Sequence, residues 1–243
     1  MKRTISRIIE NRKIGPEIFK MTLSTTECGF TKPGQFAMIE VPDRFLKRPI
    51  SVSEYSDDHF TIIYKVVGEG TEILSNMKEG EKVKSLTGCG NGYDIDKIPE
   101  GAYIIGGGIG IPPMLGLMKE LKKRGGKYKV VLGYNTKNEI FLLDEFRKIT
   151  DNIIVMTADG SFGKKGFVTD AAEIFPYACA CGPLPMLKAL DKSTESGQFS
   201  LEARMGCGFG ACMGFSIKTK EGPRRVCKEG PVFDKEVLEW QYL

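Results

Sequence analysis

A run of glycines near the middle of the chain has the spacing of a phosphate-binding turn. Gly106, Gly108 and Gly110 follow the apolar pair Ile104–Ile105, and Pro112–Pro113 stand where the next helical pattern starts. A strand that enters such a turn lets backbone N–H groups and a helix N-terminus approach a pyrophosphate closely. Prolines are tolerated in the first turn of that helix, because the N–H groups they lack would have no partner there. A glycine cluster of this kind could also be a plain tight turn, so a second element is needed to favour a ligand site.

The second element is Cys181–Gly182–Pro183, which follows an apolar stretch at 177–180 and precedes a helical pattern over 186–192. If both turns end strands of one parallel sheet, they lie at the same edge and flank one cleft, the usual ligand position in open α/β folds. We therefore predict a nucleotide site whose residues come from both turns: Gly106, Gly108, Gly110, Pro113, Cys181, Gly182 and Pro183.

The cysteines indicate metal ligation rather than disulfides. Three of the seven, Cys207, Cys212 and Cys227, lie among glycines in the C-terminal tail. An odd number of cysteines without a signal peptide argues against a disulfide framework. His59 is the only histidine, which excludes His-based catalytic triads and His-rich zinc sites. The tail is therefore expected to hold a metal through its thiolates.

The elements that must position these residues change in character near residue 100. Before it, segments rich in Ile, Val, Phe and Thr predict strands over 5–14, 18–23, 35–41 and 59–67, with a short helix over 72–77. This pattern predicts a small antiparallel β-barrel over residues 1–98. Over residues 99–198, strands at 102–105, 129–132, 153–156 and 177–180 alternate with helices at 114–123, 142–149, 170–175 and 186–192. The alternation predicts an α/β domain with a parallel sheet covered on both faces, and residues 199–243 form a cysteine-rich tail too irregular for a core of its own.

Composition and charge exclude several classes of function. The chain has 35 Lys and Arg residues against 31 Asp and Glu, and the basic residues are scattered, so nothing indicates a nucleic-acid or acidic-membrane partner. The first residues lack the apolar block of a signal peptide, and no stretch approaches the roughly 20 apolar residues of a membrane span. We expect a cytoplasmic protein.

The two glycine turns together resemble the NAD(P)-binding half of the ferredoxin–NADP reductase family, in which a flavin-binding β-barrel precedes the nicotinamide domain. Three barrel segments resemble the flavin site of that family: Arg48–Pro49–Ile50–Ser51, with Ile50 in place of the usual aromatic residue, then Ile63–Tyr64–Lys65, and Gly70–Thr71. The resemblance implies that these residues bind FAD, with Arg48 on the pyrophosphate. Asp159, together with the absence of a basic cluster after the strand at 153–156, favours NAD over NADP. Because hydride transfer between nicotinamide and flavin needs no protein acid or base, no catalytic side chain is expected.

The tail is similar to the cluster segment of the electron-transfer subunits of B-type dihydroorotate dehydrogenase, an iron–sulfur branch of this superfamily. Those proteins hold a [2Fe–2S] cluster through four cysteines, of which Cys207, Cys212 and Cys227 match three. Phe215 stands at the place of the remaining ligand, and Ser216 beside it is a weaker candidate. Because a [2Fe–2S] cluster takes two protein ligands on each iron, the sequence predicts a cluster that lacks one thiolate. The other cysteines are expected elsewhere in the fold.

The resemblance implies a flavoprotein oxidoreductase subunit in electron transport, which passes electrons between a partner dehydrogenase and NAD through FAD and the iron–sulfur cluster. The implied partner is the FMN-containing catalytic subunit of dihydroorotate dehydrogenase, in pyrimidine biosynthesis, joined in a heterotetramer. Two alternatives stay open. The chain could serve a sulfhydrogenase or an NADH-dependent ferredoxin:NADP reductase. It could also be a degenerate, non-enzymatic docking or regulatory subunit, which Phe215 favours and the intact glycine turns oppose.

Overall fold

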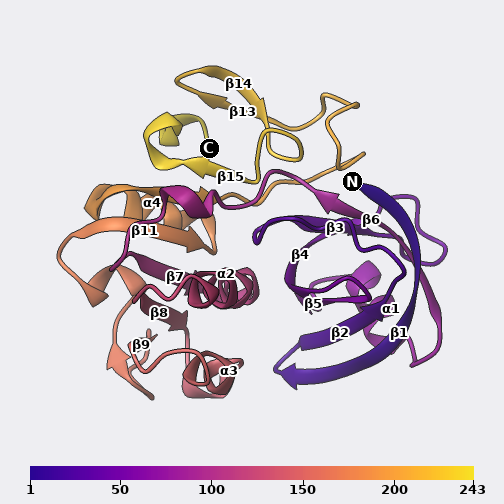
Figure 1. Cartoon of the computed structure of the whole chain (residues 1–243), viewed down its shortest axis with the longest axis horizontal. Coiled ribbons are helices and arrows are strands. Elements are labelled where there is room, and N and C mark those ends of the chain that lie inside the picture. Colours follow the sequence, from indigo (N-terminus) through magenta and orange to yellow (C-terminus); the bar gives the residue numbers. More distant parts are fainter.

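The N-terminal part of the chain is a closed β-barrel (Figure 1). The structure is a computed structural model that describes residues 1–243. Neighbouring strands pair antiparallel in the order β1-β2-β5-β4-β3-β6, and β6 closes on β1. A short helix, α1 (Glu69–Asn76), is tied to the barrel by Asn11, whose amide donates to the carbonyls of Leu74 and Met77 at 2.9 Å. The strands are β1 (Lys2–Gly15), β2 (Ile18–Ser24), β3 (Phe36–Ile39), β4 (Arg48–Tyr55), β5 (His59–Lys65) and β6 (Lys82–Cys89).

The second part is a seven-stranded sheet in the order β10-β9-β8-β7-β11-β12-β15, parallel except for β15. Neighbouring residues of β7 belong to different apolar clusters: Ile104 shares one with Leu115 of α2, and Ile105 shares the other with Leu187 of α4. Helices thus cover both faces, and the predicted barrel followed by an α/β domain is confirmed. The strands are β7 (Tyr103–Gly107), β8 (Lys129–Tyr134), β9 (Ile153–Thr157), β10 (Lys164–Lys165), β11 (Phe175–Cys181), β12 (Thr194–Ser200) and β15 (Val232–Asp234). The helices are α2 (Ile111–Lys123), α3 (Leu143–Arg147) and α4 (Leu184–Ser193).

The helix predicted over 170–175 is wrong. A single 3-10 turn covers Val168–Ala171, and Phe175 already begins β11. Asp170 uses its carboxylate to accept the Phe167 backbone N–H at 2.7 Å, a local contact that favours caps and turns over helix interiors. Phe175 precedes Pro176, and the residue before a proline is driven toward extended backbone.

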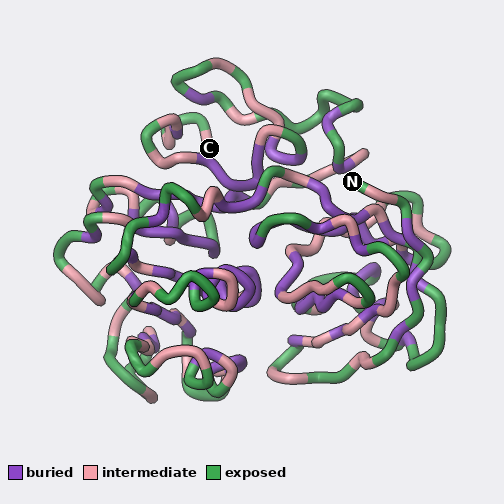
Figure 2. Tube along the Cα trace, in the orientation of Figure 1, coloured by how far each residue is buried: buried purple, intermediate pink, exposed green.

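The tail has no separate core and packs instead into the core of the sheet domain. Its strand β15 pairs antiparallel with β12 and completes the main sheet. Buried Val226, Phe233 and Leu238 pack into the same apolar cluster as α4. A small hairpin, β13 (Ser216–Thr219) and β14 (Gly222–Arg225), projects from it. In Figure 2 the central strands and α2 are buried, whereas this hairpin is mostly exposed or half-buried.

Helix α2 joins the barrel to the sheet. The Ser53 hydroxyl of β4 donates to the Pro112 carbonyl at 3.1 Å, in a buried contact. A Cβ at Gly116 would lie 2.3 Å from the Ser53 carbonyl oxygen, so only glycine permits this approach of helix and strand. The close contact fixes the N-terminus of α2, and with it the glycine turn, beside the barrel. None of the helices, of which α2 is the longest at 13 residues, combines the length and apolar character of a membrane span.

Candidate flavin, nicotinamide and iron–sulfur sites

A cavity of about 340 Å³ separates the barrel from the sheet. It brings together most of the predicted flavin residues with members of both glycine turns. Its barrel wall consists of Phe36, Arg48, Pro49, Ile50, Ser51, Ile63, Tyr64, Lys65, Val67 and Thr71. Its sheet and tail wall consists of Ile109, Pro113, Cys181, Ser200, Leu201, Glu202, Ala203, Met205 and Pro231. Residues 200–205 of this second wall were not predicted from the sequence, because they carry no recognisable motif.

The barrel side of this cavity carries an arrangement suited to an anion. A Cβ at Gly70 would lie 2.4 Å from a guanidinium nitrogen of Arg48, so the glycine allows Arg48 to lie against the first turn of α1. Thr71 orders that turn, because its hydroxyl accepts the Val67 N–H at 2.9 Å and donates to the Gly68 carbonyl at 2.8 Å. A guanidinium beside the N-terminal N–H groups of a helix is a favourable position for a pyrophosphate.

The rest of the barrel wall is mostly apolar. Tyr64 is buried, stacks on Phe19 with ring centroids 6.1 Å apart, and donates its hydroxyl to the Asn11 side-chain oxygen at 3.1 Å. Burial raises the pKa of Tyr64 well above its usual value, so the phenol stays neutral. Ile50 and Ser51 lie on β4, where Ser51 pairs with Phe36. Such a wall can hold a planar aromatic ring system with few charges near it.

The two glycine turns are in contact. A Cβ at Gly110 would lie 2.3 Å from the carbonyl oxygen of Cys181, and one at Gly106 would lie 2.9 Å from Cα of Ile111. Gly182 in turn lies against the end of the Met186 side chain. These three glycines therefore permit close packing of the turns, while Gly108 and Pro183 face a second cavity.

The second cavity, of about 420 Å³, lies at the carboxyl ends of β7, β8 and β11. This is where open parallel sheets bind dinucleotides. Its walls are Gly107, Gly108, Gly133, Tyr134, Asn135, Glu139, Gly166, Phe167, Val168, Thr169, Pro183, Pro185, Met186 and Ala189. Asn135 donates to the Glu139 carboxylate at 2.8 Å. Neither residue was predicted as part of the site, although an acidic residue shortly after the second strand of a nucleotide fold is a recognisable signal.

Asp159 lies beside this cavity rather than in its wall. Its backbone N–H donates to the Asn135 carbonyl at 3.2 Å, and its carboxylate accepts the Ser161 N–H at 2.9 Å and hydroxyl at 2.6 Å. The Ser161 side chain is the main cause that lowers the pKa of Asp159. The carboxylate is therefore ionised and directed toward its own turn.

Cys181 is buried between the two glycine turns. Burial, and to a lesser degree the Glu202 carboxylate, raises the pKa of its thiol to about 12. The side chain is therefore a neutral, compact group at neutral pH, not a nucleophile. Cys179, two residues earlier on β11, packs in the same apolar cluster, so both thiols face one side of the sheet, as the alternation of a strand predicts.

Cys207 and Cys212 lie in a loop, the cysteine loop, whose backbone surrounds the Cys207 sulfur. The Cys212 N–H donates to this sulfur at 3.4 Å. Burial alone would raise the pKa of Cys207, but backbone N–H groups of Phe209, Cys212 and Ala211 outweigh it and lower the pKa to about 6. Gly208, at φ 79°, lets the loop pack closely against the barrel, because a Cβ there would lie 2.3 Å from the Met38 side chain. Hydrogen bonds to the sulfurs are what a cluster-binding loop supplies.

These thiols fit a cluster better than a single ion. No group of three His, Cys, Asp or Glu side chains is close enough to hold one metal ion. A [2Fe–2S] cluster instead takes two ligands at each of two irons, so it needs pairs of thiols rather than a trio around one point. Cys207 and Cys212 form one such pair, and Cys227 is buried near both sulfurs. Phe215 is 41% exposed and offers no ligand atom.

Cys89 lies on barrel strand β6, as expected, but that strand packs against the tail. Cys89 shares a small buried cluster with Phe36, Met38 and Cys227. Burial raises the pKa of Cys89 to about 12, and the neighbouring sulfurs of Cys227 and Cys207 add to the shift. The tail thiols and this barrel thiol therefore lie in one region, which the sequence did not indicate.

Comparison with known proteins agrees with this arrangement. Residues 202–239 match the iron–sulfur cluster binding domain of dihydroorotate dehydrogenase B, and residues 104–192 match the oxidoreductase NAD-binding domain. The electron transfer subunit of dihydroorotate dehydrogenase B (NAD(+)) from Fusobacterium nucleatum is 41% identical, over 96% of this chain and 97% of that protein. The same subunit from Lysinibacillus sphaericus is also 41% identical, over 94% and 95%. A chain of the NADH-dependent reduced ferredoxin–NADP oxidoreductase superposes with a TM-score of 0.89 at 30% identity, over 97% of this chain and 90% of that one. The chain belongs to the family of dihydroorotate dehydrogenase B electron transfer subunits.

Proposed function

We propose that this chain is a flavin-dependent NAD oxidoreductase subunit that carries electrons between NAD and a partner dehydrogenase through FAD and a [2Fe–2S] cluster. The observation that carries the proposal is the position of the cavity between barrel and sheet. One wall offers the Arg48 anion site, the other contains Cys181 and Pro113 of the nicotinamide turns, and residues 200–205 lead from it into the cysteine loop. In this proposal the three cofactor sites follow one another along this path and form a route for electrons.

In this proposal the barrel holds FAD. Arg48 and the first turn of α1 bind its pyrophosphate, while Ile50, Ser51 and Tyr64 line the isoalloxazine ring. FAD supplies the exchange of a hydride with nicotinamide and of single electrons with a cluster. The apolar wall excludes water from that exchange, and the neutral Cys181 thiol occupies the sheet side without adding charge.

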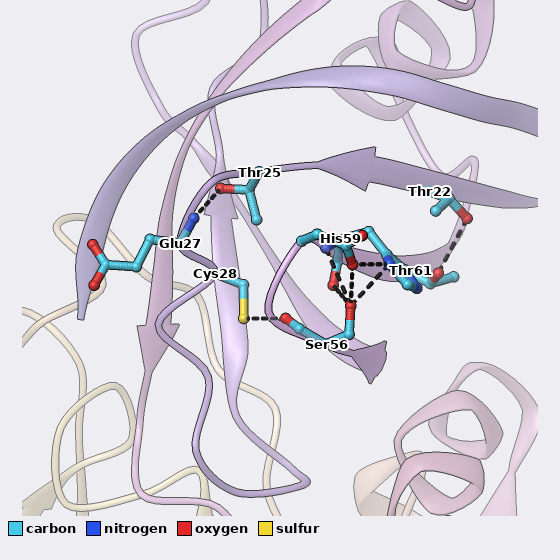
Figure 3. Close-up of polar contacts among 8 residues, drawn as sticks. Thr22, Thr25, Glu27, Cys28, Ser56, His59 and Thr61 are labelled. Atoms are coloured by element: carbon cyan, nitrogen blue, oxygen red, sulfur yellow. Dashed lines mark hydrogen bonds and ion pairs between the residues drawn. The ribbon is translucent and has the colours of Figure 1, made fainter.

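No side chain is needed as an acid or base. His59 lines neither cavity; it sits at the start of β5, where its ring nitrogen is 2.7 Å from the Asp58 carboxylate and 2.8 Å from the Ser56 hydroxyl (Figure 3). The side chains and backbone of this chain hold and orient the cofactors. In this proposal Gly108 and Pro183 contact the dinucleotide, and Asp159 lies beside its adenosine ribose.

The partner in this proposal is an FMN-containing catalytic subunit that oxidises dihydroorotate, in a heterotetramer. Relatives at about 40% identity are named as electron transfer subunits of that enzyme, which supports this choice over the ferredoxin–NADP oxidoreductase, whose chain is 30% identical. No dihydroorotate site is assigned to this chain.

The test is co-expression with a dihydroorotate dehydrogenase catalytic subunit from the same organism. We expect the two chains to co-purify, and NADH to form from dihydroorotate and NAD only when both are present. A partner that oxidises dihydroorotate but neither binds this chain nor needs it for NAD reduction would overturn the assignment. Ferredoxin-dependent reduction of NADP by a different co-purified subunit would favour the alternative.

A further inference from the structure

The strand that carries Cys89 contains a β-bulge that turns this thiol toward the tail. On β3, Phe36 and Met38 are two residues apart and share one face, whereas their partners on β6, Cys89 and Leu86, are three residues apart. The extra residue lies at Thr87–Gly88, and Gly88 has φ 65°, in the left-handed region. A Cβ there would lie 2.1 Å from the Gly29 carbonyl oxygen, so only glycine fits. Bulges re-aim side chains, and this one puts Cys89 on the same face as Leu86.

That face is covered by the tail. Phe36, Met38, Cys89 and Cys227 form one buried cluster, with Met205 packed against it. The backbone after Cys89 is bound to the segment after Cys227: the Asn91 N–H donates to the Gly230 carbonyl at 2.7 Å, and its side-chain amide donates to the carbonyls of Glu229 and Val232 at 2.9 and 2.7 Å. Gly208 lies against Met38 in the same region. Two segments more than 130 residues apart in sequence are thus fixed side by side.

We propose that Cys89 is the fourth protein ligand of the cluster, in place of a cysteine at position 215. The inference rests on the cluster of the proposed function. Cys207 and Cys212 hold one iron, and Cys89 and Cys227 hold the other. A sulfur that is still protonated releases its proton to solvent as it binds iron, with no change in the oxidation state of the sulfur. Phe215, exposed at the rim of the loop, takes no part.

The experiment compares Cys89→Ala with Cys28→Ala, which removes another buried barrel thiol. Cys28 donates to the Ser56 carbonyl at 2.8 Å, in a different cluster from the tail (Figure 3). Each protein is reconstituted anaerobically with ferrous iron and sulfide. Iron and acid-labile sulfide per FAD and the electron paramagnetic resonance spectrum after dithionite reduction are then measured. We expect Cys89→Ala to keep FAD but lose most of its iron and sulfide, and Cys28→Ala to match the wild type.

A second pair of variants separates ligation from packing. Phe215→Cys combined with Cys89→Ala should restore the cluster, because a cysteine at 215 replaces the lost ligand. Cys89→Ser, which changes only sulfur to oxygen, should shift the resonance spectrum or lower the iron content. A Cys89→Ala protein with wild-type iron and an unchanged spectrum would overturn the proposal, as would an unchanged spectrum for Cys89→Ser. So would a Cys89–Cys227 disulfide in anaerobically prepared protein.

The outcomes also distinguish this proposal from the proposed function. If the wild type takes up no cluster but Phe215→Cys does, the cluster segment is real and Cys89 is not its ligand. If neither takes up a cluster, the electron route itself is wrong.

Discussion

The two glycine turns and the cysteine loop of residues 207–212 are built in opposite ways. The turns depend on the absence of side chains. A side chain at Gly110 would clash with the backbone of Cys181, and the lack of one at Gly106 allows β7 to lie against the start of α2. The cysteine loop is formed by what is present, since N–H groups of residues 209, 211 and 212 surround the Cys207 sulfur. The first site depends on close backbone packing at the edge of a sheet, and the second depends on backbone N–H groups of a loop that surround one thiol. The two should therefore respond differently to substitution.

The largest effect should come from Gly110→Ala. The new Cβ would lie 2.3–2.5 Å from the backbone atoms of Cys181 and Gly182, which cannot move without disturbing β11. We expect the free energy of unfolding to fall by about 2–4 kcal/mol and reduction by NADH to be lost. Urea denaturation and stopped-flow mixing with NADH would measure both.

Gly125→Ala is the matched control for that change. Gly125 has φ 81° but open space around its Cβ position, so only the left-handed backbone is penalised, by about 1–2 kcal/mol. NADH reduction should persist in this variant. If Gly110→Ala behaves no differently from it, contact between the two turns is not what forms the nicotinamide site.

A smaller effect is expected for Arg48→Ala, because α1 still offers its N-terminal N–H groups. Loss of a charge-assisted contact to a phosphate should weaken FAD binding by about 10- to 150-fold, equivalent to about 1.5–3 kcal/mol. Flavin retained after dialysis and titration of the stripped protein with FAD would measure it. Arg147→Ala, which removes an exposed arginine of α3, should keep wild-type affinity. Full FAD retention by Arg48→Ala would remove Arg48 from the site.

The smallest effect concerns how the rate of Cys207 alkylation depends on pH in the protein without its cluster. The lowered pKa of Cys207 means that its thiolate prevails above about pH 6 in the folded loop and is protonated below it. Alkylation of Cys207 by iodoacetamide should therefore rise with pH through about 6 and then level off, as followed by mass spectrometry. In urea the N–H groups no longer surround the sulfur, so the pH midpoint of alkylation should rise toward the usual pKa of 9.0. A midpoint that is the same in folded and unfolded protein would show that the loop does not hold the sulfur in this way.

The same contrast explains what could be predicted from sequence. Glycine turns, strand alternation and the spacing of the tail cysteines are local signals. The barrel class, the parallel sheet and both turns followed from them, although the barrel strands β4 and β6 were not predicted. β12 was missed because Thr194–Ser200 is mostly polar, although Gln198 and Ser200 are buried by β11 and β15 on either side. The approach of Cys89 to Cys227 depends on a bulge at Gly88 and on the Asn91 hydrogen bonds, which join distant segments. No local pattern encodes such a contact.

The central claim is that this chain alone brings nicotinamide and flavin together. It is tested most directly by adding NADH anaerobically to the purified, FAD-loaded chain without any partner and following the visible absorbance of the oxidised flavin. We expect the flavin to be bleached by one equivalent of NADH, and far more slowly by NADPH. A flavin that stays oxidised in the isolated chain, and is reduced only after a partner is added, would contradict the account.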